Sequence, residues 1–255
     1  MSATPIQSVP VADVCTLEAR NVTKRFGGVT AVNGVTFRAR QDEIVGLIGP
    51  NGAGKTTLFN LMSGFFAPNE GDIYFKGERI TGLRPYEVAR RGLARTFQIC
   101  KPFPDLSVLE NVVTGAYGRA AGYAEAVEAS ENVLDQLGLY HRRLQLARHL
   151  TLPDLKRLEV ARALATAPAF LLLDEVMAGL NLKEQHEVAA MIEKIHSNGV
   201  GVVLVEHSIA MIVRLSRHVV VMDDGRHIAE GAPREAISTK AVRAAYLGLD
   251  DDSPA

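Results

Sequence analysis

The residues with the clearest chemistry form a short glycine-rich segment, residues 49–56. It matches the pattern G-x-x-x-x-G-K-[ST] in full and lies between a strand-like and a helix-like segment. Glycines let backbone N–H groups turn toward phosphate oxygens, and the following helix adds its positive N-terminal end. Lys55 can reach the β- and γ-phosphates of a nucleoside triphosphate, and the Thr56 hydroxyl can ligate Mg²⁺. An ordinary glycine-rich turn would explain neither the Lys-Thr pair nor its position, so the segment predicts a phosphate-binding loop.

The residues of this loop expected to contact a nucleotide are Gly49, Pro50, Asn51, Gly52, Ala53, Gly54, Lys55, Thr56 and Thr57.

Two apolar segments further along the chain each end in charged residues. Residues 170–173 run into Asp174 and Glu175, and residues 200–205 run into an acid and His207. Most acids at strand ends are solvated caps, but the carboxyl ends of parallel strands meet at the sheet edge where a phosphate loop also lies. We therefore expect Asp174 to support Mg²⁺, Glu175 to polarise the attacking water and His207 to contact the γ-phosphate.

The elements that must position these side chains alternate between strands and helices. Strand-like segments are expected at residues 17–26, 35–39, 43–48, 72–75, 170–173, 200–205, 219–222 and 227–229. Helix-like segments are expected at residues 55–63, 107–113, 124–137, 155–167 and 182–196, the last with an Asn181–Glu184 capping box. This order predicts an α/β protein with a mostly parallel core sheet. The first strands predict an antiparallel β subdomain, and the strand-free stretch at about 99–155 predicts an inserted α-helical subdomain.

Composition and charge favour one globular domain at residues 15–249, with flexible tails at 1–14 and 250–255. The 28 Lys and Arg nearly balance the 29 Asp and Glu, which disfavours a dedicated nucleic-acid binder. Cys15 and Cys100 lie far apart and form no metal-ligand or redox pair. No apolar run approaches the roughly 20 residues that a spanning helix needs. We expect a protein that is cytosolic by itself and reaches a membrane only through a partner.

The order of these motifs resembles that of the ABC-transporter ATPase family over residues 17–249. The resemblance implies a Walker B aspartate at Asp174, a catalytic glutamate at Glu175 and a switch histidine at His207. It also implies that Gln98 is the Q-loop residue, which senses Mg²⁺ and water and moves with the transmembrane subunit. Phe26 occupies the position at which members of the family stack an aromatic ring on adenine. The competing interpretation is that Phe26 is a core residue on an edge strand.

Several short sequence segments resemble one branch of the family, the branched-chain amino-acid importers. Within this branch they resemble the first of two ATPase subunits. The segments that carry this resemblance are residues 26–32, 57–61, 94–98, 103–112 and 246–248. The resemblance implies ATP and Mg²⁺ as cofactors and a place at the cytoplasmic face of the inner or plasma membrane. It also implies permease subunits, a second and different ATPase subunit, an extracytoplasmic solute-binding protein, and a cargo of branched-chain amino acids or related small polar solutes.

One departure from the family pattern affects the expected chemistry. The family signature Leu-Ser-Gly-Gly-Gln opens a helix whose N–H groups face the ATP of the other subunit, but residues 150–154 are Leu-Thr-Leu-Pro-Asp. Pro153 removes an N–H, Leu152 adds bulk and Asp154 adds negative charge. We expect Thr151 to cap the helix with Asp154 three residues on. In a two-subunit sandwich, the site completed by this segment would be impaired, whereas the site built on this chain's own loop would hydrolyse ATP.

Two other functions stay open at this point. A soluble ABC-type ATPase of DNA repair or translation would share the motifs, but such proteins usually join two units in one chain or carry large inserts. A regulatory subunit that only binds nucleotide would suit the altered signature but would not need both Glu175 and His207. A GTPase or small-molecule kinase is disfavoured, because no guanine-reading Asn-Lys-x-Asp occurs.

Overall fold

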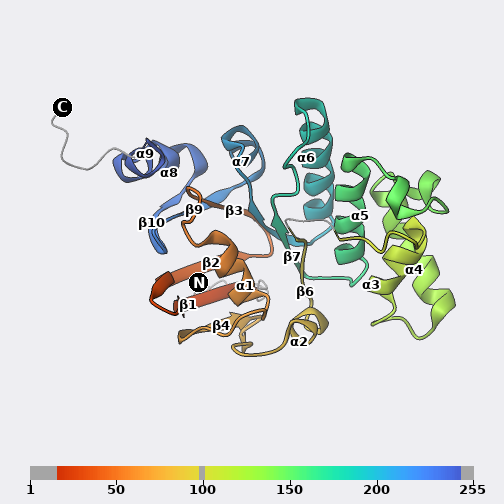
Figure 1. The fold of residues 1–255 in the computed structure, drawn as a ribbon, viewed down its shortest axis with the longest axis horizontal. Coiled ribbons are helices and arrows are strands. Elements are labelled where there is room, and N and C mark those ends of the chain that lie inside the picture. Colours follow the sequence, from red (N-terminus) through yellow and green to blue (C-terminus); the bar gives the residue numbers. More distant parts are fainter. Residues whose placement is uncertain (1–15, 98–100, 248–255) are drawn as a thin grey trace, which may run out of the picture.

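Six strands form the central sheet that supports the predicted site (Figure 1). They are β3 (Ile44–Ile48), β6 (Leu93–Arg95), β7 (Phe170–Asp174), β8 (Gly201–Val205), β9 (His218–Asp223) and β10 (Arg226–Gly231). Their order is β10-β9-β3-β8-β7-β6, parallel from β9 through β6 and antiparallel between β9 and β10. Every residue of β3, β7 and β8 is buried, as expected for parallel strands covered on both faces. The structure is a computed structural model that describes residues 16–97 and 101–247.

A second, antiparallel sheet comes from the first part of the chain. It contains β1 (Thr16–Phe26), β2 (Val29–Arg40), β4 (Glu70–Phe75) and β5 (Glu78–Arg79) in the order β2-β1-β4-β5. Helix α1 (Lys55–Met62) follows β3, and its Phe59 shares one apolar core with Phe37 of β2 and Leu172 of β7. This core joins the two sheets, so the predicted antiparallel β subdomain is confirmed and lies directly against the parallel sheet.

Three helices gather on the opposite side of the molecule, at the right of Figure 1. They are α3 (Val108–Ala116), α4 (Tyr123–Gln136) and α5 (Leu152–Leu164), with short 3-10 turns at Tyr140–Arg142 and Ala147–His149. Ser107 and Glu110 form a capping box that starts α3. The inserted α-helical subdomain is therefore confirmed as a feature of the fold, while its limits at about 99–155 stay a prediction.

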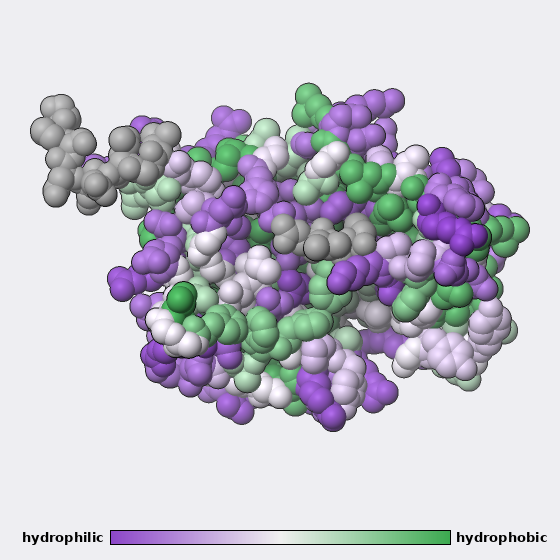
Figure 2. Space-filling model, in the orientation of Figure 1, coloured by the Kyte–Doolittle hydropathy of each residue, from purple (hydrophilic) through white to green (hydrophobic). Residues whose placement is uncertain are grey.

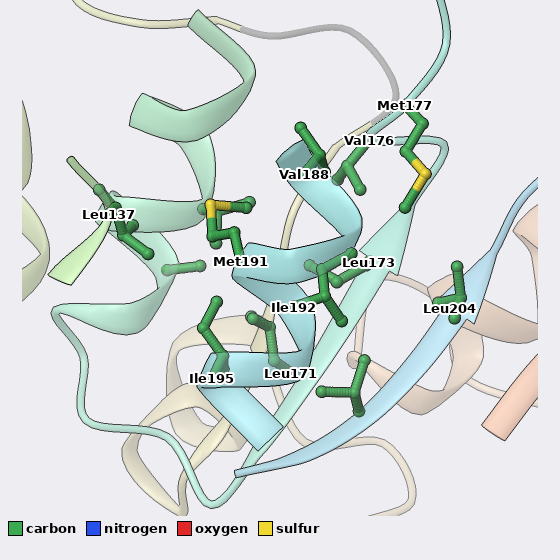
Figure 3. Close-up of a cluster of buried hydrophobic side chains, with 14 of the residues drawn as sticks. Leu137, Leu171, Leu173, Val176, Met177, Val188, Met191, Ile192, Ile195 and Leu204 are labelled. Carbon is green, nitrogen blue, oxygen red and sulfur yellow. The ribbon is translucent and has the colours of Figure 1, made fainter. Parts of the chain in front are cut away.

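Helix α6 (Leu182–Ser197) packs its apolar face on the strands that end in the predicted catalytic residues. Figure 3 shows Val188, Ile192 and Ile195 of this helix beside Leu171 and Leu173 of β7. The predicted capping box is confirmed. The Asn181 side chain accepts the Glu184 N–H at 3.0 Å, and the Glu184 carboxylate accepts the Asn181 N–H at 2.9 Å. The start of α6 is therefore fixed by local sequence and its orientation by burial.

The structure differs from the sequence prediction in several elements. Helix α5 begins at Leu152 rather than at residue 155, because Pro153 is tolerated in a first turn, where its missing N–H has no intrahelical partner. Strands β5 and β6 and four helices were not predicted, and each is short. The helices are α2 (Pro85–Arg90), α7 (Ile209–Leu215), α8 (Pro233–Ser238) and α9 (Lys240–Leu247).

Several predicted features lie outside the described residues. These are the flexible tails at 1–14 and 250–255, the two ends of the domain expected at 15–249, and Gln98. Within residues 16–97 and 101–247, the helices lack the combination of length and apolar character needed to cross a membrane.

Candidate active site

The glycine-rich loop connects the end of β3 to the start of α1, as the sequence predicts. Gly49 and Gly54 have φ angles of 150° and 96°, in the region that favours glycine. A Cβ atom would lie 2.1 Å from the Met222 carbonyl oxygen at Gly49 and 2.3 Å from the Ala31 carbonyl oxygen at Gly54. Both positions therefore exclude side chains, and the loop takes its path because only glycine fits there.

The Lys55 side chain arches back over this loop and is largely buried. Its Nζ donates to the carbonyl oxygens of Gly49 at 2.7 Å and Pro50 at 2.9 Å. Burial lowers the pKa of Lys55, while the carboxylates of Glu175 and Asp174 act to raise it. The lysine cation therefore lies between the loop and the two acids, at the sheet edge where the phosphates of a nucleotide are expected.

Asp174, at the end of β7, is held by the neighbouring strand β6. Its Oδ2 accepts from Arg95 Nη2 at 2.7 Å, and its N–H donates to Thr96 Oγ1 at 3.1 Å. The second carboxylate oxygen, Oδ1, is buried and has no hydrogen-bond partner among the described residues. An oxygen ligand left open in this way suits a cation or its bound water.

The site fits Mg²⁺ by its donor chemistry. Magnesium is usually bound by one or two protein oxygens together with substrate phosphates rather than by a protein cage. Thr56 and Asp174 line the same cavity and supply a hydroxyl and an open carboxylate oxygen. In the described part of the chain, no three His, Cys, Asp or Glu side chains cluster in a way that could hold a metal ion.

Arg95 contacts the predicted site residue Asp174, and the sequence analysis did not single it out. Its guanidinium also donates to Asn60 Oδ1 at 2.6 Å, so it connects α1 to Asp174. Burial lowers the pKa of Arg95, and the Asp174 carboxylate opposes that effect. The only signal in the sequence was its place in residues 94–98, three positions before Gln98, and that place does not distinguish a buried arginine from a surface one.

Glu175 and His207 follow the ends of β7 and β8, as predicted, and the structure adds a direct contact between their side chains. The Glu175 Oε1 and His207 Nε2 atoms are 2.9 Å apart. The carboxylate is nearly buried, whereas the imidazole is 52% exposed. A carboxylate fixed by an imidazole at the mouth of a phosphate loop can orient a water molecule and accept its proton.

Phe26 lies at the end of β1 and is 42% exposed, so it is not a core residue. Its ring makes an edge-to-face contact with Phe66 at 5.2 Å between centroids, and Lys24 Nζ lies 5.2 Å from its centroid. An exposed aromatic ring braced from one side has area available for stacking on a nucleotide base.

The described residues on either side of 98–100 are bound to α5. The Phe97 N–H donates to Glu159 Oε1 at 2.5 Å, and Arg162 Nη1 donates to the Lys101 carbonyl oxygen at 2.9 Å. The position of Gln98 relative to Asp174 remains a prediction, because Gln98 lies outside the described residues.

A groove of about 740 Å³ opens beside these residues. It separates α2 from α3 and α5, and Figure 2 shows the surface hollowed between the corresponding parts of the molecule. Thr56, Arg95 and Asp174 line it together with the exposed rings of Tyr86 and Phe97. The groove therefore connects the predicted catalytic edge to an aromatic surface.

The altered signature forms the start of α5, but its expected capping box is not present. Thr151 occupies the N-cap position without a side-chain hydrogen bond to the backbone, and its hydroxyl donates to Asp154 Oδ2 at 3.0 Å. Asp154 also pairs with Arg142 at 3.1 Å and Arg157 at 3.6 Å. The expected capping box was wrong because these arginines hold the carboxylate that would have reached the backbone.

Comparison with known proteins identifies the family. The family model described as "ABC transporter" matches residues 32–178, more than half of the chain. The high-affinity branched-chain amino acid transport ATP-binding protein BraF of Pseudomonas aeruginosa is 38% identical, over 91% of this chain and 97% of its own length. The corresponding LivG protein of Salmonella typhimurium is 36% identical with the same coverage. The chain belongs to the ABC transporter family.

This ABC transporter ATPase also has the expected fold among solved structures. The ADP conformation of MJ1267, an ATP-binding cassette of an ABC transporter, aligns with a TM-score of 0.84 and 29% identity, covering 92% of this chain and 99% of that one. The family resemblance predicted from the sequence is thus confirmed, as is the P-loop α/β fold. A switch GTPase or small-molecule kinase is excluded.

Proposed function

We propose that this chain is the ATP-hydrolysing subunit of an importer for branched-chain amino acids or related small polar solutes. The observation that carries the proposal is the convergence of Lys55, Asp174 and the Glu175–His207 pair at one edge of the sheet. The relatives named as branched-chain amino acid transport ATP-binding proteins support the cargo.

Each residue has a distinct role in the proposed reaction. The backbone of residues 49–57 and Lys55 bind the nucleotide phosphates, and Phe26 stacks on the adenine ring. Thr56, Asp174 and Gln98 hold Mg²⁺ directly or through water, and the ion neutralises phosphate charge when bound.

Glu175 orients the attacking water and accepts its proton, while His207 holds the Glu175 carboxylate in position and reaches the γ-phosphate. The backbone donors of the loop and Lys55 stabilise the charge that develops on the phosphate oxygens.

The nucleotide-binding role can be tested with the purified full chain. A fluorescent ATP analogue should bind in a Mg²⁺-dependent manner, and Glu175→Gln should bind it while turnover falls by about a hundredfold or more. Absence of Mg²⁺-dependent ATP binding in the unaltered chain, alone and with its cognate subunits, would overturn the proposal.

The groove beside Asp174 suits a docking site for a permease subunit. Its exposed rings, Tyr86 and Phe97, offer apolar contact at the surface, and its inner wall contains Asp174. A segment of a membrane subunit seated there would place the chain at the cytoplasmic face of the inner or plasma membrane. An extracytoplasmic solute-binding protein that selects the cargo is then a further partner. We propose no nucleic-acid partner.

A substitution in the groove should remove permease binding and leave nucleotide binding intact. Tyr86→Asp should abolish co-purification with the permease subunits and leave ATP binding intact, whereas Tyr123→Asp on exposed α4 should preserve both. Co-purification with ribosomes or DNA in place of a permease would instead favour a soluble ATPase.

The altered signature supports a pair of unlike ATPase subunits. Pro153 lacks an N–H, and Asp154 brings a carboxylate, already held by Arg142, to the N-terminal start of α5, where a phosphate would otherwise bind. A homodimer would place this weak signature in both nucleotide sites, so we favour a different second subunit. Glu175→Gln in this chain should then reduce turnover far more than the equivalent change in the partner, and equal losses would count against the asymmetry.

A further inference from the structure

We propose that Glu206 is a positioning residue that holds the backbone of the catalytic Glu175 in its reactive place. The inference rests on the proposed function, because it assigns Glu206 a role in the reaction assigned to Glu175. Glu206 is the acid next to His207 at the end of β8, and only 5% of it is exposed.

The backbone of Glu175 needs external support. Its φ angle is 52°, in the left-handed region that residues with a Cβ rarely adopt. Strained backbone of this kind persists only where surrounding contacts determine it. The left-handed turn bends the chain away from β7 as soon as the strand delivers Asp174, so the residues after Glu175 depend on contacts with other elements.

Two contacts fix Glu175 itself. Its N–H donates to the Val205 carbonyl oxygen of β8 at 2.9 Å. Its carbonyl oxygen accepts from Lys156 Nζ of α5 at 3.2 Å. These bonds hold the peptide groups on either side of the Glu175 Cα.

The next two residues are fixed by burial and by Glu206. The side chains of Val176 and Met177 are buried in the apolar cluster shown in Figure 3, where Val176 lies beside Val188 of α6. The Met177 N–H donates to Glu206 Oε1 at 2.9 Å. Without Glu206 this buried N–H would lose its acceptor, and a buried donor left unpaired is strongly disfavoured.

Two residues that follow β8 therefore position Glu175 through separate hydrogen bonds. His207 holds its carboxylate, and Glu206 holds the backbone two residues further on. Both residues belong to one strand end, so they can maintain the distance between the carboxylate and the phosphate loop.

Glu206 acts here as a hydrogen-bond acceptor rather than as a charge. Burial raises the pKa of Glu206 to about 7, and the nearby Glu175 carboxylate adds to this effect, while the Met177 N–H, His207 and Lys156 oppose it. A neutral side chain with a carbonyl oxygen can therefore replace it. Glutamine keeps that oxygen and leucine does not, which makes the two substitutions a matched pair.

The test uses the full chain with Glu206→Leu and Glu206→Gln, and it measures MgATP turnover, affinity for a fluorescent ATP analogue, and hydrogen exchange of the Met177 amide. We expect Glu206→Leu to lower kcat by about a hundredfold, the scale of a small misplacement of a reacting group, with nucleotide affinity unchanged. The Met177 amide should exchange faster in this variant. Glu206→Gln should keep turnover and exchange close to those of the unaltered chain.

Ser208→Ala serves as the control for general damage at this strand end. The Ser208 hydroxyl caps α7 by accepting a hydrogen bond from the Met211 N–H at 3.4 Å, and it is not the acceptor of the Met177 N–H, so turnover should stay unchanged.

Two results would overturn the inference while the proposed function stands. They are unaltered turnover in Glu206→Leu, and an equal loss in Glu206→Gln and Glu206→Leu. If Glu206→Leu does not fold, the glutamine variant decides alone, because a loss of about a hundredfold in kcat contradicts the acceptor role. An unaltered chain that neither binds nor hydrolyses MgATP overturns the proposed function and this inference together.

Discussion

Arg95 and Asp174 form a buried ion pair at the ends of two neighbouring strands, with 2.7 Å between Nη2 and Oδ2. Their side chains are 6% and 1% exposed. Parallel pairing of β6 with β7 sets Arg95 opposite Leu172, two residues before the aspartate. One carboxylate oxygen is thereby bound to the arginine, and the other is buried without a hydrogen-bond partner among the described residues.

Loss of this pair should destabilise the whole domain. Arg95→Met leaves Asp174 buried without its counter-charge, and removal of one partner of a buried ion pair costs about 3–5 kcal/mol. Urea unfolding measures the free energy. The control is Arg148→Met, which breaks an exposed pair with Asp105 of 2.6 Å and should cost about 1 kcal/mol or less. Similar losses in both variants would contradict a special role for the buried pair.

Lys55 should contribute to nucleotide affinity through its charge. Lys55→Met keeps much of the apolar length but removes the ammonium group, and a hydrogen bond to a charged group contributes about 1.5–3 kcal/mol. We expect ATP affinity to fall by about tenfold to more than a hundredfold in equilibrium titrations. Lys183→Met, an exposed lysine at the start of α6, provides the comparison and should bind normally.

Phe26 should recognise the base and not the phosphates. Stacking of a base on an aromatic ring contributes about 1–3 kcal/mol, so Phe26→Ala should weaken ATP binding by about fivefold to a hundredfold. Binding of inorganic tripolyphosphate, measured by competition, should be unaffected because it has no base. An equal loss of affinity for tripolyphosphate would show that the substitution disturbs the phosphate loop instead.

Glu206 should make stability depend on pH. Its folded pKa of about 7 lies above its ordinary value of 4.5, so the folded state binds more protons than the unfolded state between these values. The contribution of Glu206 to stability is fully present below pH 4.5 and is lost as the pH rises through about 7. The loss is on the order of 3 kcal/mol.

The measurement is the difference in unfolding free energy between the unaltered chain and Glu206→Gln, taken at pH 5 and at pH 8. Glutamine does not titrate, so the variant should gain stability relative to the unaltered chain at the higher pH. A difference that does not change with pH would contradict the raised pKa.

The phosphate loop and the two strand ends with the predicted catalytic residues could be predicted from the sequence because their information is local. Glycines, a lysine and a threonine at fixed spacing in eight contiguous residues are enough to predict the loop. The capping box at Asn181 is local in the same way, and it too is confirmed. Glu175 and His207 could be placed at one edge of the sheet because parallel strands deliver their last residues there.

Only the tertiary structure decided which polar groups support these residues. Arg95 reaches Asp174 across 79 positions, and Glu206 reaches Met177 across 29, because of strand order and burial. The same holds for the start of α5, where Arg142 from a separate turn holds Asp154 and prevents the expected cap. Contacts of this kind depend on which strands become neighbours, and that depends on packing of the whole core rather than on any short pattern.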